Sequence, residues 1–183
     1  IDFGSGGGAP HPMGGGAIRL IVNDLLTNDG TISAGGLVSS SGGSVYVTAK
    51  NISGSGVFSA NGGALSGGGY FAGPGGGGRV ALYYETSSFT GKAQALGGCG
   101  SYDGFSKTCA KNGTVGFFDT SKNDLYINNV DTTWQFRKVD EPFSFNDIFI
   151  SNGAKVTSEN NVSITAQNVF LDKNSFFTLA DNV

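Results

Sequence analysis

The sequence is poor in charged residues and has one histidine, one tryptophan and one methionine among its 183 residues. Charged side chains make up 14% of it, against about 25% in ordinary globular proteins. Its 11 lysines and arginines are scattered singly, without the basic stripe that binding to nucleic-acid phosphates requires. No apolar run approaches the ~18 residues of a membrane-spanning helix. These absences argue against a nucleic-acid partner and a helical membrane span.

Residues for catalysis or cofactor binding are equally scarce. His11 is the only histidine, so a Ser-His-Asp triad would depend on it alone, and neither flank resembles a nucleophile elbow. The glycine runs contain no GxxxxGK[ST] phosphate loop. An Asn- and Asp-rich turn over residues 23–30 could bind Ca²⁺ weakly, although it lacks EF-hand spacing. We therefore expect no cofactor and no dedicated metal site.

Two carboxylate pairs keep a polysaccharide-cleaving alternative open. Asp119 and Asp124 lie close in sequence, as do Asp140 and Glu141, and a glycosidase needs two carboxylates about 5–10 Å apart. Each of these residues falls at an expected turn, where a solvated aspartate is the default. We expect a protein that is not an enzyme.

The two cysteines, Cys99 and Cys109, are close together in a loop-like segment. They lack the CxxC spacing and the nearby histidines of a metal or redox site. A disulfide between them would stabilise the fold by roughly 2.5–3 kcal/mol in the chain-entropy model. Disulfides persist in oxidising compartments, so this pair predicts an extracellular or cell-surface protein.

What the sequence has in abundance is glycine, at 32 residues, together with 14 phenylalanines and 6 tyrosines. The glycines follow no Gly-X-Y period, which excludes collagen. So many aromatic residues argue against disorder. Because β-branched and turn residues outnumber helix formers, the composition predicts an all-β fold.

A degenerate repeat covers the first half of the chain. Its three units span residues 15–36, 42–63 and 77–98, and each reads as a glycine corner, a strand, a polar turn, a short strand and another glycine corner. Apolar and polar residues alternate within the strands, as in half-buried β-structure. A unit of about 20 residues cannot bury its apolar face alone, so the copies are expected to stack.

The repeat predicts a right-handed parallel β-helix, a solenoid, with ordered glycine-rich insertions. Residues 1–98 would form its glycine-rich half, and residues 99–183, in which apolar positions recur about every seven residues, its glycine-poor continuation. An antiparallel sandwich is the alternative. The predicted core comprises Ile18, Leu20, Val45, Val47, Val80, Leu82, Ile148, Ile150, Val162, Ile164, Val169 and Leu171.

Glycine runs at 6–8, 14–16, 67–69 and 75–78 separate the repeats. Ordered polyglycine needs close neighbours to satisfy its backbone polar groups. Bundled strands with the threefold polyglycine-II geometry would meet that need, since no side chains intervene.

The aligned motifs resemble those of large glycine-rich surface and adhesin-type proteins of bacteria, plants and protists. The resemblance covers about residues 4–130 and rests on segments 14–20, 41–47, 75–82, 98–99, 112–119 and 125–129. It implies a β-helical structural part of an adhesin, a wall protein or a fibre, without an assigned activity.

Four aromatic residues, Tyr46, Tyr83, Phe118 and Phe149, fall on the outward phase of their strands. Stacked along one face, they would form a strip suited to sugars or to a neighbouring subunit, unless glycine-rich spacers cover them. Three N-x-[ST] sequons, at Asn51, Asn112 and Asn161, are candidate N-glycosylation sites.

We therefore expect a structural extracellular surface or fibre glycoprotein that self-assembles into filaments or belongs to a larger adhesin. Its partners would be copies of itself or adjacent domains of a longer chain, with glycans as further candidates. A carbohydrate-binding or polysaccharide-cleaving β-helix domain is the alternative.

Overall fold

The computed structural model describes residues 13–65, 73–101, 107–128 and 133–179, and within them the protein is all-β. The long strands are β1 (Ala17–Thr27), β3 (Ser44–Ser53), β5 (Arg79–Ser87), β9 (Thr114–Asp119), β10 (Asp124–Asn128), β12 (Phe143–Ser151) and β14 (Ile164–Leu171). The shorter strands are β2 (Thr31–Ser33), β4 (Val57–Ser59), β6 (Lys92–Gln94), β7 (Cys99–Ser101), β8 (Lys107–Cys109), β11 (Thr133–Phe136), β13 (Lys155–Ser158) and β15 (Phe176–Thr178). One 3₁₀ turn, η1, spans Lys138–Asp140.

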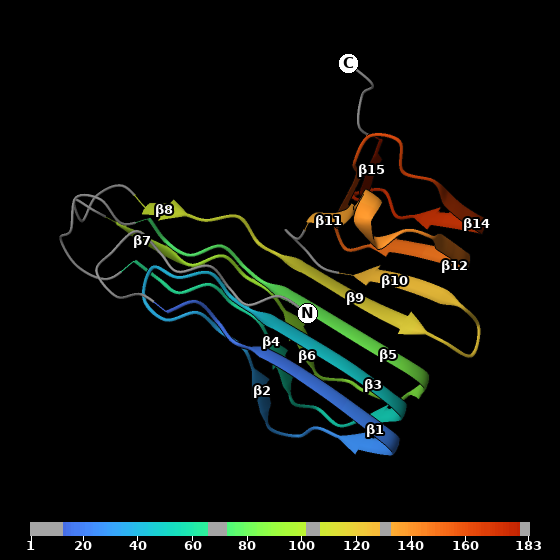
Figure 1. Cartoon of the computed structure of the whole chain (residues 1–183), viewed down its shortest axis with the longest axis horizontal. Helices are drawn as coiled ribbons and strands as arrows, with labels where there is room; N and C mark the ends of the chain where they lie inside the picture. The colour runs from blue at the N-terminus through green and yellow to red at the C-terminus, as the bar shows by residue number, and fades with distance from the viewer. Residues whose placement is uncertain (1–12, 66–72, 102–106, 129–132, 180–183) are drawn as a thin grey trace.

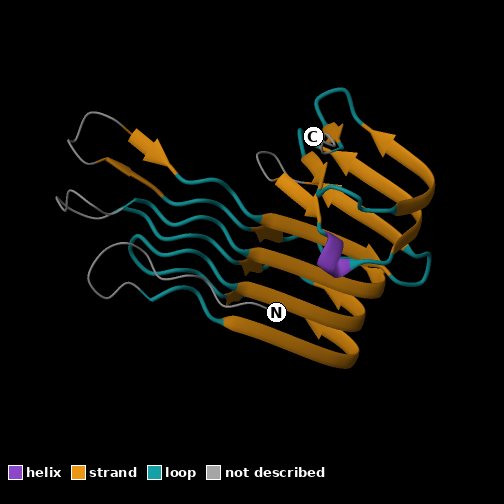
Figure 2. Cartoon of the chain, turned by 45° about the horizontal axis from the view of Figure 1, so that its top comes forward, coloured by secondary structure: helices purple, strands orange, loops and turns teal. Residues whose placement is uncertain are grey.

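The long strands form one seven-stranded sheet in the order β1-β3-β5-β9-β10-β12-β14 (Figures 1 and 2). Two three-stranded sheets, β2-β4-β6 and β11-β13-β15, accompany it, and β7 and β8 form a separate hairpin. The described neighbours in the seven-stranded sheet run parallel except for β9 and β10, which are antiparallel. The sheet is therefore mixed.

In the structure, the repeat units of the sequence lie side by side, and equivalent residues of successive units are in register. Val45 of β3 aligns with Val80 of β5, and Val80 aligns with Val115 of β9. All three are at most 1% exposed. They belong to a first hydrophobic core, which β2, β4 and β6 close with Ile32, Phe58 and Ala93. Stacked copies thus bury the apolar face that one unit leaves exposed.

The β9–β10 hairpin moves the core to the opposite face of the sheet. Phe118 of β9 lies opposite Leu125 of β10, and residues directly opposite in an antiparallel pair share a face. Both belong to a second core around β10, β12 and β13, whereas the preceding residue, Phe117, packs on the first core. The two halves of the chain therefore close on opposite faces of one sheet.

This switch corrects the prediction of a right-handed parallel β-helix. Strand direction reverses at the hairpin, the covering sheet changes face, and no closed solenoid forms in the described residues. The physical reason lies in the hand of the crossover connections, which folded proteins conserve. When successive strands continue across the sheet in the same order, reversing their direction inverts the hand of the crossovers. Moving the crossovers to the other face of the sheet inverts that hand a second time. The two inversions cancel, so each half keeps the same hand.

Burial of the predicted core falls off at the ends of the sheet. Ile148 and Ile150 of β12 are 0% and 1% exposed, but their β14 partners Val169 and Leu171 are 41% and 46% exposed. The prediction that Val169 and Leu171 are buried is wrong, because β14 is an edge strand. The other predicted core residues are buried or half-buried, the latter being Ile18, Leu20, Val162 and Ile164.

Extended glycine-rich segments continue the strands on one side of the molecule (Figure 2). We call residues 13–16, 34–43, 60–64, 73–78, 95–98 and 110–113 the glycine array. Its hydrogen bonds run in two directions: Gly78 donates to the Ala60 carbonyl and accepts from the Thr114 amide. Gly43 likewise donates to Ala34 and accepts from Arg79. Backbone groups that a loop would leave to water are thereby paired.

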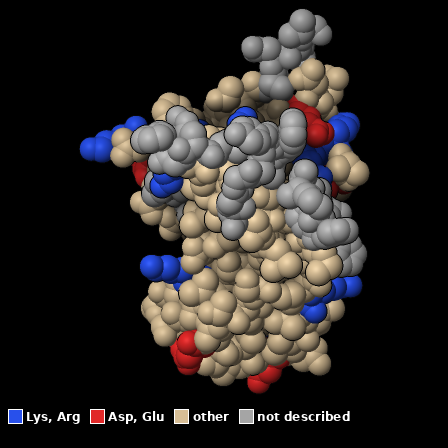
Figure 3. Space-filling view, turned by 90° about the vertical axis from the view of Figure 1, so that its left-hand side faces the viewer, with Lys and Arg blue, Asp and Glu red and all other residues tan. Residues whose placement is uncertain are grey.

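On the side of the molecule facing the viewer in Figure 3, residues without charge fill the centre, with Lys and Arg side chains at both edges. The glycine runs at 6–8 and 67–69 lie outside the described residues, and the polyglycine-II geometry stays a prediction.

The division into residues 1–98 and 99–183 also stays a prediction. The first core includes Val115 and the second begins at Leu125.

Candidate functional site

The outer face of β3, β5 and β9 is hollowed where its side chains become small. Tyr46 of β3 is in register with Ala81 of β5, and Ala81 with Gly116 of β9. The ring of Trp134, from β11, lies so close over Gly116 that an added Cβ would press against it. Small side chains here leave room between the sheet and the second half of the chain.

Three of the four aromatic residues predicted to form a strip stand beside this hollow. The rings of Tyr46 and Tyr83 have centroids 4.9 Å apart, and those of Tyr83 and Phe118 are stacked 4.2 Å apart. The Arg19 guanidinium lies 5.8 Å from the centroid of the Tyr46 ring, within cation–π range. The ladder thus crosses three parallel strands.

The opposite wall comes from the second half of the chain. The centroids of Trp134 and Phe145 lie 5.8 Å and 6.5 Å from that of Phe118. Together the two walls enclose a cavity of about 500 Å³, within the range of about 300–1,000 Å³ typical of small-ligand sites. The aromatic rings that line it are Tyr46, Tyr83, Phe118, Trp134, Phe143 and Phe145.

A second cavity of about 340 Å³ adjoins the first, and Arg79, Trp134, Gln135 and Asp140 line both. We call the two cavities together the aromatic groove. Asp140 is paired with Arg137 at 2.7 Å. Burial, followed by the proximity of Tyr46 and of Asp140, raises the pKa of Tyr83 to about 12. The Tyr83 phenol therefore remains neutral at physiological pH.

Phe149, the fourth residue of the predicted strip, lies on the other face of the sheet. It stacks between Tyr126 and Phe170, with centroid distances of 4.7 Å and 4.8 Å. Tyr126 is opposite Phe117, so this ladder is on the side of the first core. The switch of face at the hairpin therefore separates Phe149 from Tyr46, Tyr83 and Phe118.

Asp119 and Asp124 face each other across the β9–β10 hairpin and both line the groove. Asp119 accepts hydrogen bonds from the Ser121 hydroxyl and the Lys122 amide. Burial alone would raise the pKa of Asp119, but these bonds outweigh burial and hold its pKa below the usual value. Asp124 accepts from the Asp147 amide and the Tyr126 hydroxyl. Asp119 therefore fixes the turn of the hairpin, whereas Asp124 ties β10 to β12.

The second carboxylate pair is committed to local structure as well. Asp140 forms a bidentate pair with Arg137, and Glu141 pairs with Lys138 and accepts from the Ser163 amide. These contacts hold the pKa of Glu141 below its usual value. Asp140 lies in the groove, whereas Glu141 ties η1 to the segment before β14.

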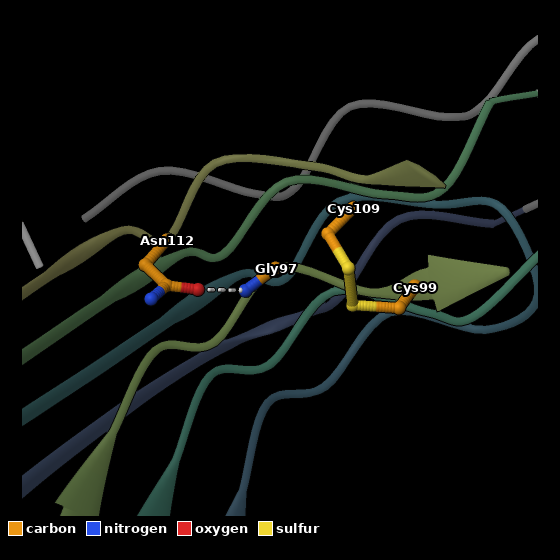
Figure 4. The surroundings of a disulfide bond; sticks show 4 residues. All are labelled: Gly97, Cys99, Cys109 and Asn112. Atoms are coloured by element: carbon orange, nitrogen blue, oxygen red, sulfur yellow. Dashed lines mark hydrogen bonds between the residues drawn. A yellow bond between two sulfur atoms is a disulfide. The ribbon is translucent and has the colours of Figure 1, made fainter. Parts of the chain in front are cut away.

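The three sequons differ in their surroundings. Asn51 donates its side-chain amide to Asp24 and accepts from the Thr86 hydroxyl. The side-chain oxygen of Asn112 accepts from the Gly97 amide (Figure 4). Asn161 is exposed in a turn at a φ of 58°. Surface attachment of a glycan is most compatible with Asn161.

The Cys99–Cys109 disulfide predicted from the sequence is present. It joins β7 to β8 directly beside the glycine array, next to the Gly97–Asn112 hydrogen bond (Figure 4). The turn expected at 23–30 is shorter in the structure, because β1 continues to Thr27; beyond it, Asp29 accepts from the amide and hydroxyl of Ser55. His11 lies outside the described residues.

Sequence reasoning did not assign Trp134, Ala81 or Gly116 to a site. Trp134 is the only tryptophan of the sequence, and that was the one feature that could have marked it as a site residue. Within the described ranges, no three His, Cys, Asp or Glu side chains are grouped to hold a metal ion, and no helix there is long and apolar enough to cross a membrane.

Comparison with known proteins finds no family model that matches the sequence, no similar curated protein and no similar solved structure. The resemblance to glycine-rich surface and adhesin-type proteins therefore stays an expectation.

Proposed function

We propose that the chain is an extracellular structural module of a surface or fibre assembly, stacking end to end with copies of itself through β1 and β14. The loss of burial at the two end strands supports this. Side chains that are fully buried in β12 have half-exposed counterparts in β14. At the other end, Val45 and Val47 are 1% and 0% exposed, whereas their β1 partners Ile18 and Leu20 are only half-buried.

The sheet already contains the junction that such stacking would need. A copy translated along the stack would bring its β1 antiparallel to β14, with the two cores on opposite faces. This is the relationship between β9 and β10. The contact would join different surfaces of the two copies and would not close, which produces an open filament. Unpaired edge strands otherwise invite uncontrolled association.

The extracellular location is supported by the disulfide, since such bonds persist in oxidising compartments. A purely structural function fits the carboxylates as well. Asp119 accepts from Ser121 and Lys122 in the hairpin turn, and Asp124 accepts from the Asp147 amide of β12, so both carboxylates have structural roles. We accordingly propose no polysaccharide cleavage.

Sedimentation velocity over a range of protein concentrations tests the assembly. We expect the wild-type chain to form concentration-dependent linear oligomers and Leu171→Lys to abolish them by placing a charge at the β14 end. Val139→Lys is the matched control, because Val139 is 79% exposed on η1 and belongs to neither end strand. A wild-type monomer at every concentration would contradict self-assembly and favour an adjacent domain of a longer chain as the partner.

A further inference from the structure

The aromatic groove is long enough for a chain-like ligand. Its two cavities share the side chains of Arg79, Trp134 and Gln135. One cavity extends over Tyr83 and Phe118 toward the hairpin, and the other extends toward Arg137 and Thr157. A ligand of several linked rings would occupy both, whereas a single small ring would fill only one.

The lining combines ring surfaces with hydrogen-bonding groups. Trp134 and Phe145 come from one wall, Tyr83 and Phe118 from the other, and exposed Gln135 lies where the cavities meet. The electron-rich faces of aromatic rings attract the weakly positive C–H groups of a sugar ring. Amide and guanidinium groups suit the paired hydroxyls along its edge.

Two of the carboxylates that line the groove are ion-paired within the protein. Asp140 is held by Arg137, and Asp119 lies 3.4 Å from Lys122. A ligand with a formal charge would therefore have to compete with an existing ion pair, whereas a neutral ligand would leave both intact.

The indole N–H of Trp134 provides an independent indication. It is buried and has no hydrogen-bond partner among the described residues, although buried donors are nearly always paired. Its residue lines both cavities. The N–H has less than 1 Å² of its own surface exposed, so a ligand hydroxyl oxygen would accept from it only after the Trp134 ring turns toward the cavity. We propose that the aromatic groove binds a neutral oligosaccharide, with Trp134 at the centre of the site.

The lining residues of the groove come mainly from β3, β5, β9, β10 and residues 134–145, and none of them belongs to the end strands β1 and β14. Sugar binding and end-to-end assembly can therefore fail separately. Because Trp134 is the only tryptophan of the sequence, its fluorescence reports on this site alone.

The test is titration of the full chain with neutral hexasaccharides of glucose, xylose, mannose and N-acetylglucosamine, and with polygalacturonate as the acidic comparison. Tryptophan fluorescence and calorimetry are recorded in parallel. We expect at least one neutral hexasaccharide to bind and to shift the Trp134 emission. The absence of binding by every neutral sugar at millimolar concentration overturns the proposal, and so does binding of polygalacturonate alone.

Three variants locate the site. Ala81→Leu fills the hollow and should abolish binding, while Trp134→Phe, followed by calorimetry, removes the N–H donor and should weaken binding about 3- to 10-fold. Phe149→Ala is the control, since it removes a stacked ring from the ladder on the opposite face. Circular dichroism verifies that each variant is folded. Undiminished binding by folded Ala81→Leu, or equal loss in folded Phe149→Ala, contradicts the proposal.

Discussion

Phe118 and Leu125 lie directly opposite each other across the antiparallel β9–β10 pair, and both pack into the second core. Phe117, one residue earlier, packs into the first core. Two consecutive phenylalanines thus belong to two different cores on opposite faces of the same sheet. This pair of neighbours marks where the chain changes sides, and the aromatic groove lies beside it.

The glycine array requires glycine where neighbouring backbone segments lie too close together to admit a Cβ atom. We expect Gly78→Ala to lower the free energy of unfolding by about 1–3 kcal/mol, because the added Cβ would collide with the carbonyl oxygen of Gly43. Gly16→Ala is the control, since a Cβ there meets nothing within 4 Å. Chemical denaturation measures both. Equal stability of the two variants would contradict the packing of the array.

Truncating a side chain to alanine should cost less stability in the end strands than in the strands beside them. Ile150→Ala is expected to cost about 2–5 kcal/mol through loss of a buried side chain, and Leu171→Ala, at the partner position in β14, about 1 kcal/mol. Urea unfolding of dilute protein gives both values. If Leu171→Ala costs as much as Ile150→Ala, the β14 end is covered even in dilute solution.

The Asp119 carboxylate predicts that the stability of the fold decreases at acidic pH. Because hydrogen bonds hold the pKa of Asp119 below its usual value, its contribution is complete above the unfolded-state pKa of about 3.9 and disappears as the pH falls through the lower folded-state pKa. We expect Asp119→Asn to lose about 1–2 kcal/mol at neutral pH. Thermal unfolding from pH 7 to pH 2 should show the difference shrinking; a constant difference would contradict the assignment.

Alkaline titration should reveal at least two tyrosines that ionise late. The pKa values of Tyr83 and Tyr84 are raised to about 12, chiefly by burial, whereas an unfolded tyrosine ionises near 10. The stability gained by keeping them neutral is complete below about pH 10 and is lost as the pH rises through 12. Phenolate absorbance measures this. Tyr83→Phe should remove one late ionisation from the titration curve. An unchanged curve would contradict the raised pKa of Tyr83.

The disulfide should stabilise the fold by constraining the unfolded chain. We expect Cys99→Ala combined with Cys109→Ala to lower the free energy of unfolding by roughly 2.5–3 kcal/mol. Intact mass with and without reductant identifies the bond in the native protein. Two freely alkylated thiols in unreduced material would contradict it and weaken the proposal of an extracellular location.

Local sequence patterns were sufficient for the all-β class, the disulfide and most of the buried positions. The alternation at Val45, Val47, Val80 and Leu82 fixes which side chains face the core, and the structure buries all four. Such patterns depend only on neighbours within a strand, so they can be read without the fold.

The reversal at β9–β10 was missed, although the sequence contains its signal. Only residues 120–123 separate the two strands, while a parallel crossover needs about a dozen residues. Four residues permit a hairpin and no crossover. The prediction that Phe149 shares a face with Tyr83 requires strands that close on one face throughout, and the antiparallel β9–β10 pair removes that condition. Trp134 could not be assigned either, because its contact with Phe118 depends on which face the second half covers.

The separation of the cores has a consequence for how proteins of this architecture can change in length over evolution. Each half stacks its strands on its own face of the shared sheet. Duplication or deletion of one repeat in the first half would extend or shorten that half without repacking the second. Whole repeats are then the natural unit of variation, and the hairpin is a fixed point between two segments that can lengthen independently.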